Sequence, residues 1–152
     1  MSDSQVETAQ WASFYLAGEL FALQVEHVQE VLLQQSYSPV PLAPAYIIGL
    51  VNLRGQIIAA IDLRTLLHFP TRQESGTLLV VKDRELIGIV VDEIGDVLEL
   101  PASGWRPPPD TLAEKHRGFV FGIWPMAERL VLGLRIELLG GAEGEKQEIG
   151  HG

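Results

Sequence analysis

Residues 49–63 read GLVNLRGQIIAAIDL and predict a β-hairpin. Two apolar runs flank a short polar elbow at Arg54 and Gly55, a pattern typical of two strands joined by a tight turn. Glycine supplies the positive φ that such turns often need. If Leu53 points into a core, alternation along the strand turns Arg54 outward. The hairpin then holds one cation at a fixed place, which suits partner recognition better than catalysis.

Similar short apolar runs continue on both sides of the hairpin. We expect one or two helical turns over Leu63–Phe69, stopped by Pro70, and irregular backbone around the three prolines at 107–109. About nine or ten short strands indicate an all-β fold, closed as barrels or as a sandwich. Besides the hairpin arms, the predicted strands cover residues 11–16, 20–25, 28–33, 77–82, 85–92, 96–100, 119–124 and 130–136.

Two of the predicted strands echo each other. Ile57–Asp62 and Leu86–Asp92 are both strongly apolar and both end in Asp. Two small barrels packed against each other would explain the echo, and so would coincidence; the sequence leaves both readings open. The Gly/Glu-rich tail over 140–152 is expected to be disordered.

Composition narrows the class of protein. A chain of 152 residues has the size of one domain, and its formal charge of −9 with only 11 Lys and Arg argues against binding nucleic acid or an anionic membrane surface. The absence of cysteine excludes disulfides and thiolate metal sites. The polar start lacks a signal-peptide pattern, and the longest apolar run is far short of the ~20 residues of a membrane span. We therefore expect a cytoplasmic protein without membrane insertion.

Candidates for catalysis are weak. Asp62 and Asp92 both end apolar strands and could serve a hydrolase if they met at one water. Asp at a strand end is more often a turn former that accepts hydrogen bonds from backbone amides. The four histidines are isolated in sequence and no nucleophile elbow or phosphate loop occurs, so neither a metal nor a cofactor is expected.

The segment at 27–33 carries a mixed signal. In a regular strand Val28, Glu30 and Leu32 share one face, and Gln29, Val31 and Leu33 share the other. Neither face is purely polar, so one apolar set lies beside a charged residue and is partly exposed. That arrangement is found in binding grooves and also in ordinary half-buried edge strands.

From about Phe14 to Leu139 the chain resembles the CheW-like coupling proteins of bacterial chemosensory systems. The resemblance rests on several short motifs that follow one another in the family's order, and their combination is specific. These motifs are Phe21–Val25, Val28–Val31, Pro39–Pro41, Gly49–Gly55, Ile61–Leu63, Gly88–Asp92 and the closing strand near Leu130–Ile136. The loop over 101–117, with Trp105, and the tail after Gly140 do not map onto family motifs.

The resemblance implies an all-β fold of two small five-stranded SH3-like barrels that share an apolar seam, with short helices. Residues 1–139 would form a single domain of two such subdomains. It also implies an adaptor without enzymatic activity, which bridges the cytoplasmic tip of a chemoreceptor (a methyl-accepting protein) to the regulatory domain of a CheA-type histidine kinase in membrane-associated receptor arrays. Alternatives are a CheW-like module for another kinase pathway, such as twitching motility, and an Asp-dependent hydrolase.

The family's partner-binding positions can be carried over residue by residue. A charge pair between Glu30 and Arg54 is implied, with Val28 and Val31 supplying apolar contact. The implied partner-binding residues are Val28, Glu30 and Val31 on the strand, and Gly49, Asn52, Arg54 and Gly55 on the hairpin.

Overall fold

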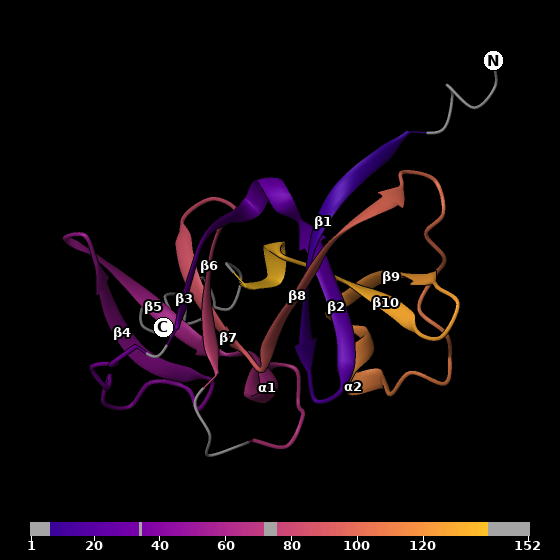
Figure 1. The fold of residues 1–152 in the computed structure, drawn as a ribbon. Coiled ribbons are helices and arrows are strands. Elements are labelled where there is room, and N and C mark those ends of the chain that lie inside the picture. Colours follow the sequence, from indigo (N-terminus) through magenta and orange to yellow (C-terminus); the bar gives the residue numbers. More distant parts are fainter. Residues whose placement is uncertain (1–6, 34, 72–75, 140–152) are drawn as a thin grey trace.

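The computed structural model describes residues 7–33, 35–71 and 76–139, and Figure 1 shows their fold. Ten strands form two five-stranded sheets, and the helices are short. The predicted all-β class with two five-stranded units is therefore confirmed, whereas closure of each sheet into a barrel stays a prediction. The tail predicted to be disordered lies outside the described residues. The elements are β1 (Thr8–Leu16), β2 (Glu19–Gln24), η2 (Val25–His27), β3 (Val28–Leu33), β4 (Ile47–Leu53), β5 (Gln56–Asp62), α1 (Leu63–Leu66), β6 (Thr77–Lys82), β7 (Leu86–Val91), β8 (Glu93–Pro101), α2 (Glu114–Arg117), β9 (Val120–Pro125) and β10 (Leu130–Leu134).

The two sheets share one topology. The first has the order β8-β1-β2-β10-β9, and the second has the order β3-β6-β7-β5-β4. In each sheet one parallel pair, β2 with β10 or β7 with β5, lies among antiparallel pairs. The first sheet is thus a cyclic permutation of the second, because β8, β9, β10, β1 and β2 take the places of β3 to β7.

The echo between Ile57–Asp62 and Leu86–Asp92 does not arise from this repeat. These residues belong to β5 and β7, which are parallel neighbours in one sheet, with Ile61 opposite Ile89. The interpretation that each strand belongs to a different barrel is therefore wrong. Both strands are strongly apolar because each contributes to cores on both faces of the second sheet.

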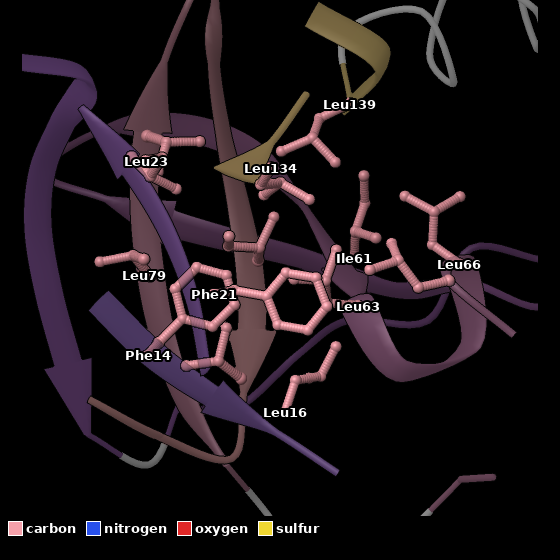
Figure 2. Packing of buried hydrophobic residues seen from close by; sticks show 14 of the residues in the cluster. Phe14, Leu16, Phe21, Leu23, Ile61, Leu63, Leu66, Leu79, Leu134 and Leu139 are labelled. Atoms are coloured by element: carbon pink, nitrogen blue, oxygen red, sulfur yellow. The ribbon is translucent and has the colours of Figure 1, made fainter. Parts of the chain in front are cut away.

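A core between the sheets joins them, and Figure 2 shows its packing. Phe14 and Phe21 of the first sheet stack in parallel with ring centroids 5.7 Å apart, and side chains such as Ile61 and Leu79 of the second sheet complete the packing. The predicted apolar seam is thereby confirmed. This seam core consists of Phe14, Leu16, Phe21, Leu23, Ile61, Leu63, Leu66, Leu67, Leu79, Val81, Ile87, Ile89, Val91, Val120, Ile123, Leu132, Leu134 and Leu139.

Each sheet also has a core on its other face. The first-sheet core contains Trp11, Leu20, Ala22, Leu100, Trp124 and Val131. The second-sheet core contains Val51, Ile58, Ala60, Leu78 and Val80. Side chains that alternate along a strand can therefore be apolar on both faces, which explains the short uninterrupted apolar runs in the sequence.

The predicted helix after the hairpin is present but short. Asp62 caps α1, since its carboxylate accepts hydrogen bonds from the Arg64 amide at 3.2 Å and the Thr65 hydroxyl at 2.8 Å. The helix ends at Leu66, ahead of Pro70. It places Arg64 beside Asp92, at the crossover where the chain passes from β7 of the second sheet to β8 of the first.

Asp92 links the sheets at that crossover. Its carboxylate accepts two hydrogen bonds from the Arg64 guanidinium, at 2.9 and 2.7 Å, and one from the Ala17 amide at 2.8 Å. Ala17 lies in the β1–β2 turn with a φ of 53°, a left-handed conformation that the bond helps to hold. The Arg64 and Asp92 side chains are only 13% and 16% exposed, so solvent screens this pair weakly.

Replacing Asp92 by Asn tests the link. The amide keeps the shape of the carboxylate, but it carries no charge and leaves the shielded guanidinium without its counter-ion. We expect the free energy of unfolding to fall by about 2 kcal/mol in urea denaturation. Asp110→Asn is the matched control. Asp110 is fully exposed and its contact with Arg117 is long, at 3.6 Å, so this substitution should leave the free energy of unfolding unchanged. Equal stability of the two variants would contradict a structural role for Asp92.

Candidate functional site

The β4–β5 hairpin ends in a two-residue turn. Leu53 pairs with Gln56, and the residues between them, Arg54 and Gly55, have φ values of 54° and 87°. Both values are left-handed, as in the type I′ turns that suit twisted hairpins. The Gly55 amide donates to Oδ1 of Asn52 at 2.9 Å and closes the turn. The predicted hairpin is confirmed, but the left-handed backbone of Arg54, which costs about 1 kcal/mol in a non-glycine residue, was not anticipated.

The turn brings Arg54 to Glu30. The guanidinium Nη2 donates to Glu30 Oε2 at 2.8 Å, so the charge pair implied by the family resemblance is present. Glu30 lies on β3 and Arg54 follows β4, and these are the two edge strands of the second sheet. The bond therefore spans from one edge of this sheet to the other.

The two side chains of the pair differ in their exposure to solvent. The Arg54 side chain is 80% exposed, whereas that of Glu30 is 24% exposed. A pair with such an exposed member contributes at most about 1 kcal/mol to stability. Its main physical effect is to orient the cation at the surface while the carboxylate stays partly sheltered.

Strict alternation on β3 fails at its start. A register shift between Val28 and Glu30 places Val28 opposite Val81 and Glu30 opposite Val80. Val81 belongs to the seam core and Val80 to the second-sheet core. Val28 therefore packs against the seam core, and the prediction that it shares a face with Glu30 is wrong because a bulge interrupts the alternation.

The other face of β3 presents apolar side chains to solvent. Val31 is 44% exposed and Leu33 is 72% exposed, and on the hairpin Ile57 is 57% exposed. The partly exposed apolar side chains that were expected within residues 27–33 are therefore Val31 and Leu33. Exposed apolar groups of this kind are typical of protein-binding surfaces, and Val31 directly follows Glu30 on the edge strand β3.

Two features near the hairpin were not predicted from the sequence: the exposed side chain of Leu42 and the structural reason for glycine at position 49. Leu42 is fully exposed in a turn whose Ala43 amide donates to the Val40 carbonyl, and its φ is 66°. Gly49 is buried, and a Cβ there would lie 2.5 Å from the carbonyl oxygen of Ser38. Its role in the structure is to let the segment before β4 approach closely, so a direct part in binding stays a prediction.

Asp62 and Asp92 lie at the ends of neighbouring parallel strands, but they form different structural bonds. Asp62 caps α1 and Asp92 joins Arg64 to the β1–β2 turn. These bonds are those of turn-forming carboxylates, as the commoner reading of the sequence predicted, and they leave the hydrolase without support. Within residues 7–33, 35–71 and 76–139, no group of three His, Asp or Glu side chains is placed to hold a metal ion.

Comparisons with known proteins agree with this architecture. Residues 10–143 match the CheW-like domain family. The chemotaxis protein CheW of Treponema pallidum is 31% identical over 77% of this chain and 73% of its own length. That of Klebsiella aerogenes is 30% identical over 83% of this chain and 78% of its own length.

A solved structure is similar as well. The scaffolding protein TtCheW from Thermoanaerobacter tengcongensis is 28% identical and superimposes with a TM-score of 0.77, covering 85% of this chain and 90% of that one. Over the residues that the structure describes, two five-stranded sheets around a seam core, with short helices only, define an all-β class of domain. Within that class, this chain belongs to the CheW-like family. Across the part of the chain that the structure describes, no helix is long and apolar enough to span a membrane.

Tyr37 provides a pH test of the packing beneath the hairpin. It packs against the second-sheet core, and burial raises the pKa of its hydroxyl above the ordinary value of 10.0. Above that pH the folded state holds a proton that the unfolded state releases, so the free energy of unfolding falls as pH rises. Tyr37→Phe lacks this contribution and should lose less stability between about pH 9 and about pH 11. If urea denaturation gave the same dependence of the free energy of unfolding on pH for both proteins, the assigned effect of Tyr37 burial would be contradicted.

Proposed function

We propose that this chain is a cytoplasmic chemosensory adaptor without enzymatic activity. It couples the cytoplasmic tips of chemoreceptors to the regulatory domain of a CheA-type histidine kinase, and it is recruited by them to membrane-associated arrays. The observation that carries the proposal is the match of residues 10–143 to the CheW-like domain family. The structural likeness to a protein described as a scaffold supports the same reading.

The partner-binding surface that we propose contains Glu30, Val31 and Arg54 as its exposed or half-exposed members. Val31 contributes apolar contact, and the charge pair fixes the register of the interface. Asn52 and Gly55 form the turn that carries Arg54. Val28 and Gly49 act from below, by packing the strands that hold the surface.

Coupling requires more than binding. An adaptor transmits a signal only if its contact with receptor or kinase differs in free energy between the active and inactive states of that partner. A surface held on two strands of one sheet suits this task. It can bind one conformation of the partner more tightly than another without changing its own conformation. We also propose that residues 1–139 form a single domain of two subdomains, which the seam core shared by the two sheets supports.

The first test is calorimetric titration with the regulatory domain of a CheA-type kinase from the same cell. Arg54→Glu and Glu30→Lys each place like charges together and are expected to weaken binding at least about tenfold, or 1.4 kcal/mol. The double variant restores opposite charges in exchanged positions and should recover part of the loss. Binding of both single variants at the affinity of the unmodified chain would contradict the assignment.

Two controls separate charge from fold. Arg54→Asn removes the cation but keeps a residue that tolerates the left-handed backbone, so circular dichroism should show an intact fold while binding weakens. Arg84→Glu changes the same charge at the exposed β6–β7 turn and should leave binding unchanged. An equal loss for Arg84→Glu would indicate a general electrostatic effect of net charge instead of a defined interface.

A further inference from the structure

A pocket of about 460 Å³ lies where the first sheet meets the β6–β7 turn of the second. Its volume is within the range of small-molecule sites. Three aromatic side chains, Trp11, Trp105 and Phe121, line it together with the carboxylates of Asp83 and Glu137. Trp105 comes from the 101–117 loop, which the family motifs did not explain.

Trp105 contacts the other two aromatic side chains of the wall. The Trp105 ring meets those of Trp11 and Phe121 edge-on, at centroid distances of 5.1 and 4.5 Å. It rests over Gly122 and Gly133, which face each other on β9 and β10. A Cβ at Gly133 would come within 2.9 Å of the Trp105 ring, so these glycines make the space that the indole occupies.

Backbone bonds hold the loop that carries Trp105. The Arg106 amide donates to the Ile123 carbonyl at 3.0 Å, and the Ile123 amide donates to the Arg106 carbonyl at 2.8 Å. This bridge attaches the loop to β9 directly after Trp105. The wall is therefore preformed, which lowers the entropic cost of binding a ligand against it.

The charged side chains that line the pocket are the carboxylates of Asp83 and Glu137, and the imidazole of His27 lines it as well. Asp83 and Glu137 are both exposed, and neither Lys nor Arg is among the described residues that line the pocket. Glu137 is 3.6 Å from Arg135, a loose and exposed contact. Aromatic faces attract cations, and nearby carboxylates raise the local concentration of cations. An anionic ligand would meet repulsion from both carboxylates.

We propose that this pocket binds a small organic cation, a quaternary ammonium or protonated amine, with its charge against the aromatic wall and the two carboxylates at the mouth. Asp83 belongs to the β6–β7 turn of the second sheet, and Glu137 follows β10 of the first. A bound cation would therefore bridge the two sheets. The site is separate from the Glu30–Arg54 surface and does not depend on the proposed adaptor function.

Choline and its neutral isostere 3,3-dimethylbutan-1-ol test the charge requirement, since they have nearly the same shape. Each is titrated into the full chain, and binding is followed by tryptophan fluorescence and calorimetry. We expect saturable choline binding that salt weakens, and binding of the neutral isostere at least about tenfold weaker. Equal binding of the two, or no saturation by choline, would overturn the proposal.

The double variant Asp83→Asn with Glu137→Gln tests the carboxylates without changing side-chain shape. Both residues are exposed, so the fold should be retained. Choline affinity is expected to fall roughly tenfold while binding of the neutral isostere stays the same. Asp110→Asn with Glu128→Gln removes the same two charges away from the pocket and should leave choline binding unchanged. Unaltered choline binding in the Asp83/Glu137 variant would contradict the site.

Discussion

The seam core is the constraint on which the rest of this structure depends. Each sheet buries one face against its own core, and the remaining apolar face can be removed from water only by the other sheet. Phe14 and Phe21 from one sheet and Ile61 and Leu79 from the other are therefore packed as one unit. Because interiors are close-packed, this unit fixes how the sheets lie relative to each other. The Arg64–Asp92 pair adds a directional polar link beside it.

The proposed partner surface depends on this rigidity. Glu30 and Arg54 belong to opposite edges of the second sheet, and their bond forms only if the sheet curves enough to bring the edges together. Arg54 also needs a turn whose left-handed backbone is held by Asn52 and the neighbouring Gly55. The cation's position thus results from sheet curvature and turn geometry together. Local strain of this kind persists where surrounding structure determines it.

Sequence reasoning reached the features that depend on local chemistry. The turn at Arg54 and Gly55, the role of Asp62 as an acceptor for a neighbouring backbone amide and the strand pattern follow from residue type and spacing, and the structure confirms them. The Glu30–Arg54 pair came from family resemblance, because nothing in a separation of 24 residues predicts a contact. Pairings between distant segments were out of reach for the same reason.

The failures have identifiable physical causes. A bulge reversed the face expected for Val28, and alternation alone contains no information about where bulges occur. The echo between β5 and β7 was open to two readings, since two parallel strands that are buried on both faces look alike. The position of the Trp105 side chain could not be predicted from the sequence. It depends on Gly122 and Gly133, which only the pairing of β9 with β10 brings together beneath the indole.

The permuted topology has a consequence for biosynthesis. All strands of the second sheet lie between residues 28 and 91, so they can pair as soon as that stretch leaves the ribosome. The first sheet joins β1 and β2 to strands that are translated later, β8 to β10. Until those arrive, the apolar faces of β1 and β2 have no sheet to complete, and such surfaces attract chaperones and proteases. Truncated translation products that lack the late strands would thus be marked for removal before they could compete with finished molecules.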